Sequence, residues 1–187
     1  MKNQGNGQAR ILSTSELERL FCELKTPRDR CLFAICLFTA CRISEALALS
    51  TIDIRGGNIV FRKATTKGRL RTRSMAIHPE LKRFLQEYEP PKRPGLMFPP
   101  GHLGGNNKHL CRARADKIFR DACTRAEIEG ASTHSFRRTA LSMMSSAGVP
   151  LRTIQEISGH ADLGTLQRYL EVSPDEVKAA IEVINFK

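Results

Sequence analysis

The sequence has no tryptophan and only two tyrosines, so each tyrosine is more informative than usual. It also lacks the motifs of metal and nucleotide enzymes, since it contains no His-Glu-x-x-His, no Walker loop and no cluster of paired carboxylates. Four of its aspartates, Asp53, Asp116, Asp121 and Asp162, are scattered along the chain, which argues against a metal-dependent nuclease. The sequence therefore predicts neither a metal site nor a cofactor.

None of the six cysteines forms a Cys-x-x-Cys pair. Cys31, Cys36 and Cys41 recur every five residues, so they would not share one face of a helix. This pattern predicts reduced, mostly packed thiols in a cytosolic protein, rather than disulfides or a metal site. No apolar run reaches the length of a membrane span, and the N-terminus lacks the apolar core of a signal peptide. We therefore expect a cytoplasmic, nucleoid-associated protein without membrane contact.

Basic residues outnumber acidic ones, which gives a formal net charge of +11 and a pI near 9.8. This charge points to a polyanionic partner. Nucleic acid is favoured over a membrane surface, because no amphipathic basic helix stands apart from the apolar pattern. A length of 187 residues suffices for one domain with a sizeable core, or for two small ones at most.

Hydrophobic periodicity predicts a mostly α-helical protein with a small antiparallel β-sheet or hairpin. Residues 1–12 are expected to be a flexible arm and residues 13–187 a single domain. The expected helices cover about 13–24, 27–40, 42–49, 79–88, 107–125, 134–147, 151–158 and 174–186. Strands near 58–63 and 74–77 should pair around a basic tip at 65–69. The proline-rich stretch 89–107 is expected to be a surface loop.

Several residues that can act on phosphate follow one another late in the chain. His134 and Arg137 are three apart and share one face of a predicted helix, His160 follows the next helix, and Tyr169 comes nine residues later. A free phenol has a pKa of roughly 10, so a tyrosine nucleophile needs a proton acceptor and nearby positive charge. Each residue also has an ordinary explanation, such as a surface His–Arg pair or a packed core tyrosine.

Two further basic residues lie earlier in the chain. Arg42 follows a very apolar predicted helix, where it must be paired or face an anion. Glu45 is the obvious partner, but Arg42 and Arg137 could also clamp one phosphate between two planar guanidinium groups. Lys67 lies at the hairpin tip, within six basic residues and no acid between positions 62 and 73. It can protonate a leaving oxygen, or simply belong to a solvated basic turn.

Taken in order, these residues resemble the pattern of the tyrosine recombinase (phage integrase) family, which is Arg, Lys, His-x-x-Arg, His or Trp, and Tyr. The intervals of 25, 23 and nine residues that separate the matching positions also fit the family. The resemblance covers nearly all of the chain from residue 13. It departs from the family at Thr39-Ala40, where Thr-Gly is frequent, and at Ser158, where leucine is common. The matching residues are Arg42, Lys67, His134, Arg137, His160 and Tyr169.

The resemblance implies the catalytic-domain fold of these enzymes and a site-specific recombinase that cleaves and rejoins DNA through a 3′-phosphotyrosyl intermediate. By analogy, Tyr169 would attack the scissile phosphate while the two arginines hold its non-bridging oxygens. Lys67 would protonate the leaving 5′-oxygen. His134 would help to manage the tyrosine proton, and His160 would complete the phosphate pocket. Neither ATP nor a metal is implied.

The expected partners are double-stranded DNA and further copies of the chain. By family analogy, the amphipathic C-terminal segment 174–186 would dock on a neighbouring protomer in a tetramer on DNA, with a monomer or dimer when free. Packing of that segment on its own domain is the alternative. Arg112 and Arg114 are the expected base readers, and the other basic side chains would contact phosphates. The full predicted set is Arg69, Arg71, Arg73, Arg112, Arg114 and Lys117.

Family members usually carry a separate N-terminal helical domain, for which this sequence has no room. The size resembles that of the small recombinases that invert fimbrial promoter segments, although a truncated integrase or an excised domain would look the same. Two other functions stay open. One is an inactive relative that binds DNA as a repressor or assembly factor, and the other is a DNA-relaxing activity like that of a type IB topoisomerase.

Overall fold

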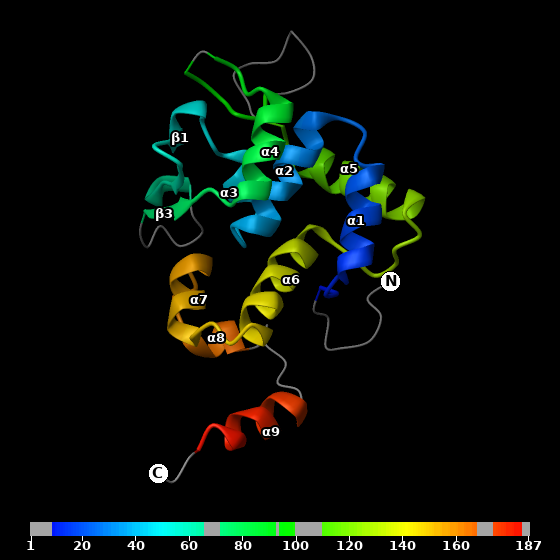
Figure 1. Cartoon of the computed structure of the whole chain (residues 1–187). Coiled ribbons are helices and arrows are strands. Elements are labelled where there is room, and N and C mark those ends of the chain that lie inside the picture. Colours follow the sequence, from blue (N-terminus) through cyan, green and yellow to red (C-terminus); the bar gives the residue numbers. More distant parts are fainter. Residues whose placement is uncertain (1–8, 66–71, 93, 100–109, 168–173, 185–187) are drawn as a thin grey trace.

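The computed structural model describes residues 9–65, 72–92, 94–99, 110–167 and 174–184 of the chain. These residues form a mostly helical protein with one small antiparallel sheet (Figure 1), which confirms the predicted fold class. The helices are α1 (Thr14–Glu23), α2 (Pro27–Phe38), α3 (Ile43–Leu47), α4 (Pro79–Tyr88), α5 (Arg112–Arg125), α6 (Thr133–Ser146), α7 (Leu151–Ser158), α8 (Leu163–Gln167) and α9 (Pro174–Glu182).

Helix α2 lies at the centre of the fold because its residues from 31 onward are all apolar. Thr26 caps it by accepting a hydrogen bond from the backbone N–H of Asp29 at 3.1 Å, and Pro27 fills its first turn. All six residues from 31 to 36 are buried. Helices α3, α4 and α6 pack against it (Figure 1). This burial fixes the end of α2, and with it the position of the segment that carries Arg42.

The sheet contains three antiparallel strands in the order β1 (Ile54–Arg55), β2 (Asn58–Phe61) and β3 (Arg73–Ala76). β2 and β3 are the predicted hairpin strands, and their register places Phe61 opposite Arg73. β1 is an addition that the sequence did not reveal, because two residues are too few for a recognisable alternation. The predicted hairpin tip falls in 66–71, outside the described residues.

Helix α6 contributes to two hydrophobic clusters. In the larger one, the ring of Phe136 stacks on Phe33 and meets Phe119 edge-on, with both centroid separations at 5.4 Å. In the smaller one, Leu141 of α6 packs with Ile154 of α7 and Leu166 of α8. The first half of α6, which carries His134 and Arg137, therefore packs on the main body, and its second half packs on the α7–α8 pair.

The segment predicted as a surface loop at 89–107 contributes to the core. Met97 and Phe98 are fully buried. The ring of Tyr88 stacks on Phe98 with centroids 5.6 Å apart, and its hydroxyl donates to the carbonyl oxygen of Met97 at 2.7 Å. The loop prediction is therefore wrong for these residues, because prolines and glycines around them concealed a short apolar anchor.

The last residues of the predicted N-terminal arm are held against α6. Leu12 is buried, and its backbone N–H donates to Thr139 Oγ1 at 2.9 Å. Arg138 Nη1 donates to the carbonyl oxygen of Ala9 at 2.7 Å. Residues 9–12 are thus anchored, which corrects the prediction of a flexible arm at its C-terminal end. Residues 1–8 lie outside the described part of the chain.

Smaller differences concern helix ends and the cysteines. α5 begins at Arg112 rather than near 107, α9 ends at Glu182 rather than 186, and α8 was not predicted. All six cysteines are free thiols, and four of them are buried, which agrees with the prediction of mostly packed thiols. Among the described residues, no helix is both long and apolar enough to cross a bilayer.

Replacing Phe136 by alanine should lower the free energy of unfolding by about 3–5 kcal/mol, because it removes the ring that α2 and α5 share. Met143→Ala is the matched control, since Met143 lies on the same helix and is 49% exposed. Its expected change is within about 0.5 kcal/mol. Urea unfolding followed by circular dichroism measures both, and equal stability of the two variants would contradict the assignment of Phe136 to the core.

Candidate active site

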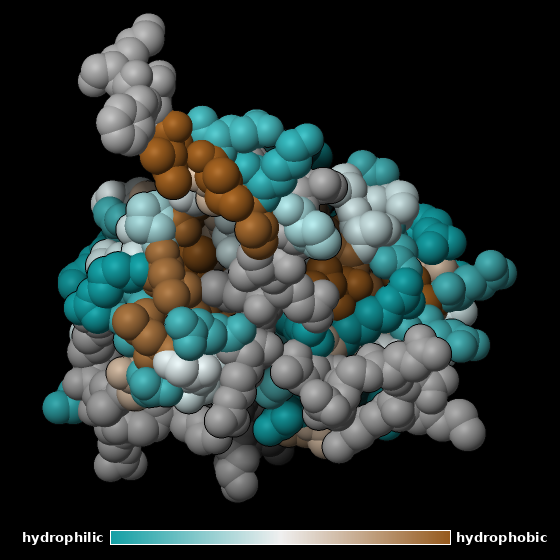
Figure 2. Space-filling view, turned by 90° about the horizontal axis from the view of Figure 1, so that it is seen from below, coloured by the Kyte–Doolittle hydropathy of each residue, from teal (hydrophilic) through white to brown (hydrophobic). Residues whose placement is uncertain are grey.

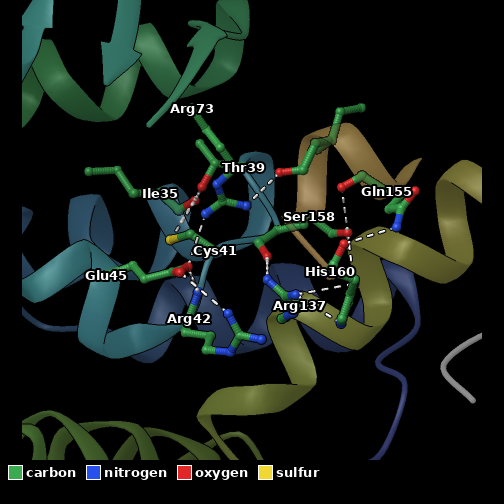
Figure 3. Close-up of polar contacts among 12 residues, drawn as sticks. Ile35, Thr39, Cys41, Arg42, Glu45, Arg73, Arg137, Gln155, Ser158 and His160 are labelled. Atoms are coloured by element: carbon green, nitrogen blue, oxygen red, sulfur yellow. Dashed lines mark hydrogen bonds and ion pairs between the residues drawn. The ribbon is translucent and has the colours of Figure 1, made fainter. Parts of the chain in front are cut away.

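Arg42 is held at the start of α3 by a buried carboxylate. Its backbone N–H donates to Glu45 Oε2 at 2.9 Å, and its Nη1 lies 3.3 Å from Glu45 Oε1 (Figure 3). The Glu45 side chain is 1% exposed, whereas that of Arg42 is 24% exposed. The ion pair between Arg42 and Glu45, which the sequence suggested, is therefore present. It anchors one edge of the guanidinium and leaves part of it at the surface.

Arg73 occupies a position that does not agree with its prediction as a DNA contact. Its side chain is 5% exposed, and its Nη2 lies 3.1 Å from Glu45 Oε2. Its Nη1 donates to the carbonyl oxygen of Ile157 at 2.8 Å, and its Cζ lies 5.2 Å from the centre of the Phe61 ring. The strand alternation offered a signal, since Arg73 shares a face of β3 with the partly buried Met75.

Arg137 is brought beside the end of α2 by the packing of α6. It is 2% exposed, and its Nη1 donates to the carbonyl oxygen of Ala40 at 2.6 Å. Ala40 has a φ of 49°, a left-handed conformation that favours glycine. This is the position at which family members often have glycine. The sequence offered no signal that a backbone carbonyl would bind Arg137.

His160 follows the left-handed residue Gly159, which ends α7 with φ 67° and ψ 35°. The Nη2 atom of Arg137 lies 3.0 Å from His160 Nε2 and 3.3 Å from Nδ1 (Figure 3). Ser158 Oγ lies 2.8 Å from Nδ1, and Gln155 Nε2 donates to the His160 carbonyl oxygen at 3.0 Å. Ser158 and Gln155 are two site residues that the sequence analysis missed.

The electrostatic environment keeps both histidines neutral. Burial, followed by the charges of Arg137, Arg42 and Arg73, lowers the pKa of His160 from 6.5 to about 3. Burial, followed by the charges of Arg112, Arg137 and Arg42, also lowers the pKa of His134. Because a guanidinium only donates, a neutral ring nitrogen on His160 can accept from Arg137. Neutral imidazoles can likewise accept a proton during a reaction.

A cavity of about 420 Å³ lies between α5 and the start of α6, next to His134. Arg112, Asp116 and Arg120 line it from α5. Thr133 Oγ1 donates to Asp116 Oδ1 at 3.0 Å, and Arg112 Nε lies 3.6 Å from Asp116 Oδ2. The surface around His134 is therefore open and predominantly basic.

The structure brings together four of the six residues that matched the family pattern, namely Arg42, His134, Arg137 and His160. Among the predicted DNA contacts, Arg112, Arg114 and Lys117 are exposed on α5. Across the described ranges, no group of three or more His, Cys, Asp or Glu side chains could hold a metal ion. The predicted site residues outside these ranges are Lys67, Arg69, Arg71 and Tyr169.

The other tyrosine of the chain, Tyr88, has a structural role. It is half-buried, and its hydroxyl is committed to the Met97 carbonyl oxygen. Burial, with a smaller contribution from Cys31, raises its pKa to about 12. A phenol with a raised pKa and a hydroxyl bound to a carbonyl oxygen is a poor nucleophile, so these features favour a structural role for Tyr88.

The low pKa of His160 predicts that the protein loses stability in acid. The folded state binds this proton only near pH 3, whereas the unfolded chain binds it below about pH 6.5. The contribution is therefore complete above pH 6.5 and is lost progressively as the pH falls toward 3. The free energy of unfolding, measured in urea, should fall more steeply over this pH range for the wild type than for His160→Gln. Parallel pH profiles would contradict the prediction.

The chain is similar in sequence to known recombinases and integrases. A putative integrase/recombinase of Sinorhizobium fredii is 28% identical, with 90% of this chain and 54% of that protein covered. The tyrosine recombinase XerC of Lactobacillus delbrueckii subsp. bulgaricus is 29% identical, with 79% of this chain and 52% of that protein covered. The chain thus spans about half the length of these curated relatives.

Among solved structures, the catalytic domain of bacteriophage HP1 integrase is similar at a TM-score of 0.70 and 25% identity, covering 94% of this chain and 95% of that one. XerH recombinase bound to its difH substrate is similar at a TM-score of 0.71 and 22% identity, covering 96% of this chain and 56% of that one. The model of the phage integrase family matches residues 10–176. The chain therefore belongs to the phage integrase family of tyrosine recombinases and has the fold of their catalytic domain.

Proposed function

We propose that this chain is a site-specific DNA recombinase that cleaves and rejoins DNA through a 3′-phosphotyrosyl intermediate. The observation that carries the proposal is the convergence of two anchored arginines, Arg42 and Arg137, with two neutral histidines. Three separate parts of the chain supply these groups: the α2–α3 turn, α6 and the segment after α7. Membership of the family supports the same function.

In this proposal the arginines bind the scissile phosphate. Arg42 is held by Glu45, and Arg137 by the Ala40 carbonyl and the His160 ring, so neither side chain has to be ordered when DNA binds. Preorganised donors of this kind stabilise the charge that develops on the phosphoryl oxygens. His160 completes the pocket as a neutral group, so it adds no negative charge beside Arg137.

Tyr169, His134 and Lys67 carry out bond formation and proton transfer in this proposal. The Tyr169 hydroxyl oxygen attacks phosphorus and forms the phosphotyrosyl ester, while the bond to the 5′-oxygen breaks. His134 accepts the tyrosine proton, as its lowered pKa allows. Lys67 supplies a proton to the departing 5′-oxygen. Tyr169 is favoured as the nucleophile because Tyr88, the second tyrosine, is bound to the Met97 carbonyl.

DNA binding is proposed to use the exposed basic side chains beside this pocket. Arg112 and Arg114 begin α5, and Arg112 lies close enough to His134 to lower its pKa. This position supports a role for the first turn of α5 in contacting DNA next to the reacting phosphate. Arg69, Arg71 and Lys117 are assigned to the DNA backbone, where Lys and Arg release counterions.

We also propose that segment 174–186 mediates self-association on DNA. Its helix α9 and the residues after it expose four large apolar side chains. Figure 2 views the molecule from the end at which α9 lies and shows a brown apolar patch on this face. Burial of this surface against a second copy would remove it from water. The residues are Val177, Ile181, Val183 and Ile184, between 50% and 80% exposed.

The function predicts a covalent protein–DNA adduct that depends on Tyr169. A pool of duplexes with a nick and randomised flanking sequence would trap the adduct, because the short cleaved strand diffuses away. Wild-type protein should capture a subset of these duplexes in a form that resists detergent, whereas Tyr169→Phe should capture none above background. Tyr88→Phe is the matched control, and it should retain capture.

The other outcomes separate the alternatives. Equal recovery of DNA by the wild type and Tyr169→Phe would contradict the recombinase proposal. Binding of duplexes without any adduct would favour an inactive DNA-binding relative. Relaxation of supercoiled plasmid without sequence preference would favour the topoisomerase-like activity.

A further inference from the structure

Arg73 lies behind the proposed phosphate pocket and contacts both parts of the chain that hold it. Its Nη2 lies 3.1 Å from Glu45, which anchors Arg42, and its Nη1 donates at 2.8 Å to the Ile157 carbonyl oxygen, three residues before His160. These contacts join β3 to α3 across 28 positions of the chain and to α7 across 84. A single buried side chain therefore links two segments that are far apart in the sequence.

The backbone before His160 is shaped to accommodate this side chain. A Cβ atom at Gly159 would lie 2.7 Å from Arg73 Nη1 and 2.9 Å from its Cδ. Gly159 also has a φ of 67°, so two constraints act on the same residue. The turn that ends α7 thus packs directly against Arg73, and a change in the arginine changes the surface on which this turn rests.

The Glu45 carboxylate is shared between two cations with different exposure. Oε2 accepts from the backbone N–H of Arg42 at 2.9 Å and from Arg73 Nη2 at 3.1 Å, while Oε1 faces Arg42 Nη1 at 3.3 Å. Arg73 is 5% exposed and Arg42 is 24% exposed. When Arg42 engages a phosphate, Arg73 still compensates the buried negative charge. Without Arg73, Arg42 would be the one remaining charged partner of Glu45 among these contacts.

We propose that Arg73 is a positioning residue, which fixes Arg42 and His160 relative to each other through Glu45 and the turn formed by residues 157–159. Its planar guanidinium donates in two directions at once, to the carboxylate and to the carbonyl oxygen, which a lysine ammonium cannot match in geometry. The consequence for DNA cleavage rests on the proposed function, but the structural consequence for His160 does not.

The test compares Arg73→Gln and Arg73→Lys with Arg83→Gln in the full chain. Arg83 is a suitable control because it is 63% exposed on α4 and pairs with Glu80, away from the pocket. Nitrogen–proton correlation spectra of the histidine rings report on the site without DNA. Both Arg73 variants should shift the His160 ring resonances, whereas Arg83→Gln should leave the His160 resonances unchanged.

The catalytic readout uses the nicked duplexes that wild-type protein captures. At saturating protein, adduct formation by both Arg73 variants should slow by about 100-fold, because a misplacement of about 1 Å is sufficient for such a loss. The DNA dissociation constant should stay within about twofold of the wild-type value. Arg73→Lys keeps the charge beside Glu45, so it provides a folded variant if Arg73→Gln does not fold.

Three results would overturn the inference. The first is an unchanged His160 spectrum in the folded Arg73 variants. The second is full recovery of the rate in Arg73→Lys. The third is weaker DNA binding combined with an unchanged rate of adduct formation in the saturated complex. If the salt dependence of binding also fell by about one phosphate contact, Arg73 would be a DNA contact. If the wild type itself forms no adduct, the proposed function fails, and the ring spectra still decide the positioning role.

Discussion

A buried carboxylate holds this site together. Glu45 is 1% exposed and lies between the guanidinium groups of Arg42 and Arg73. Two charges are removed from water almost completely, which is costly unless each is paired and hydrogen-bonded. Loss of one partner from such a pair costs about 3–5 kcal/mol, because an uncompensated charge stays in the interior. The arrangement therefore ties the position of Arg42 to the stability of the fold.

Burial and neighbouring arginines together lower the pKa of both histidines. Burial is the larger cause for His134 and His160, and the charges of Arg137 and Arg42 act in the same direction on both rings. The pocket thus concentrates positive charge on arginines, which cannot lose their protons, and keeps its imidazoles neutral. This division of roles is suited to a phosphate, which needs fixed positive charge on its oxygens and a separate acceptor for the proton of the nucleophile.

Much of the fold could be predicted because its signals are local. The capping box at Ser13, the proline that begins α2 and the left-handed glycine that ends α7 each depend on a few neighbouring residues. The order of Arg42, His134, Arg137 and His160 was equally readable, since it depends on identity and spacing alone. Their convergence depends on tertiary packing, yet the family pattern already implied it.

What the sequence could not reveal depends on contacts between distant residues. Arg73 stood in a basic run and resembled a DNA contact. Strand alternation places it on the face of Met75, but its partners Glu45 and Ile157 lie far away in the sequence. The Ala40 carbonyl became a partner of Arg137 because the chain turns in a left-handed conformation after α2. Met97 and Phe98 were hidden among prolines and glycines. In each case the deciding partner lies in another element, beyond the reach of local patterns.

We infer that Glu45 holds Arg42 and Arg73 in place in the absence of any ligand. Nitrogen–proton spectra of the arginine side chains test it most directly, because a guanidinium held by a buried carboxylate rotates more slowly than a solvated one and gives resolved Nη–H signals. Wild-type protein should show such signals for Arg42 and Arg73 and averaged ones for the exposed Arg83, and Glu45→Gln should broaden or merge the first two. Averaged signals for Arg42 in the wild type, or signals unaltered by Glu45→Gln, would contradict the account.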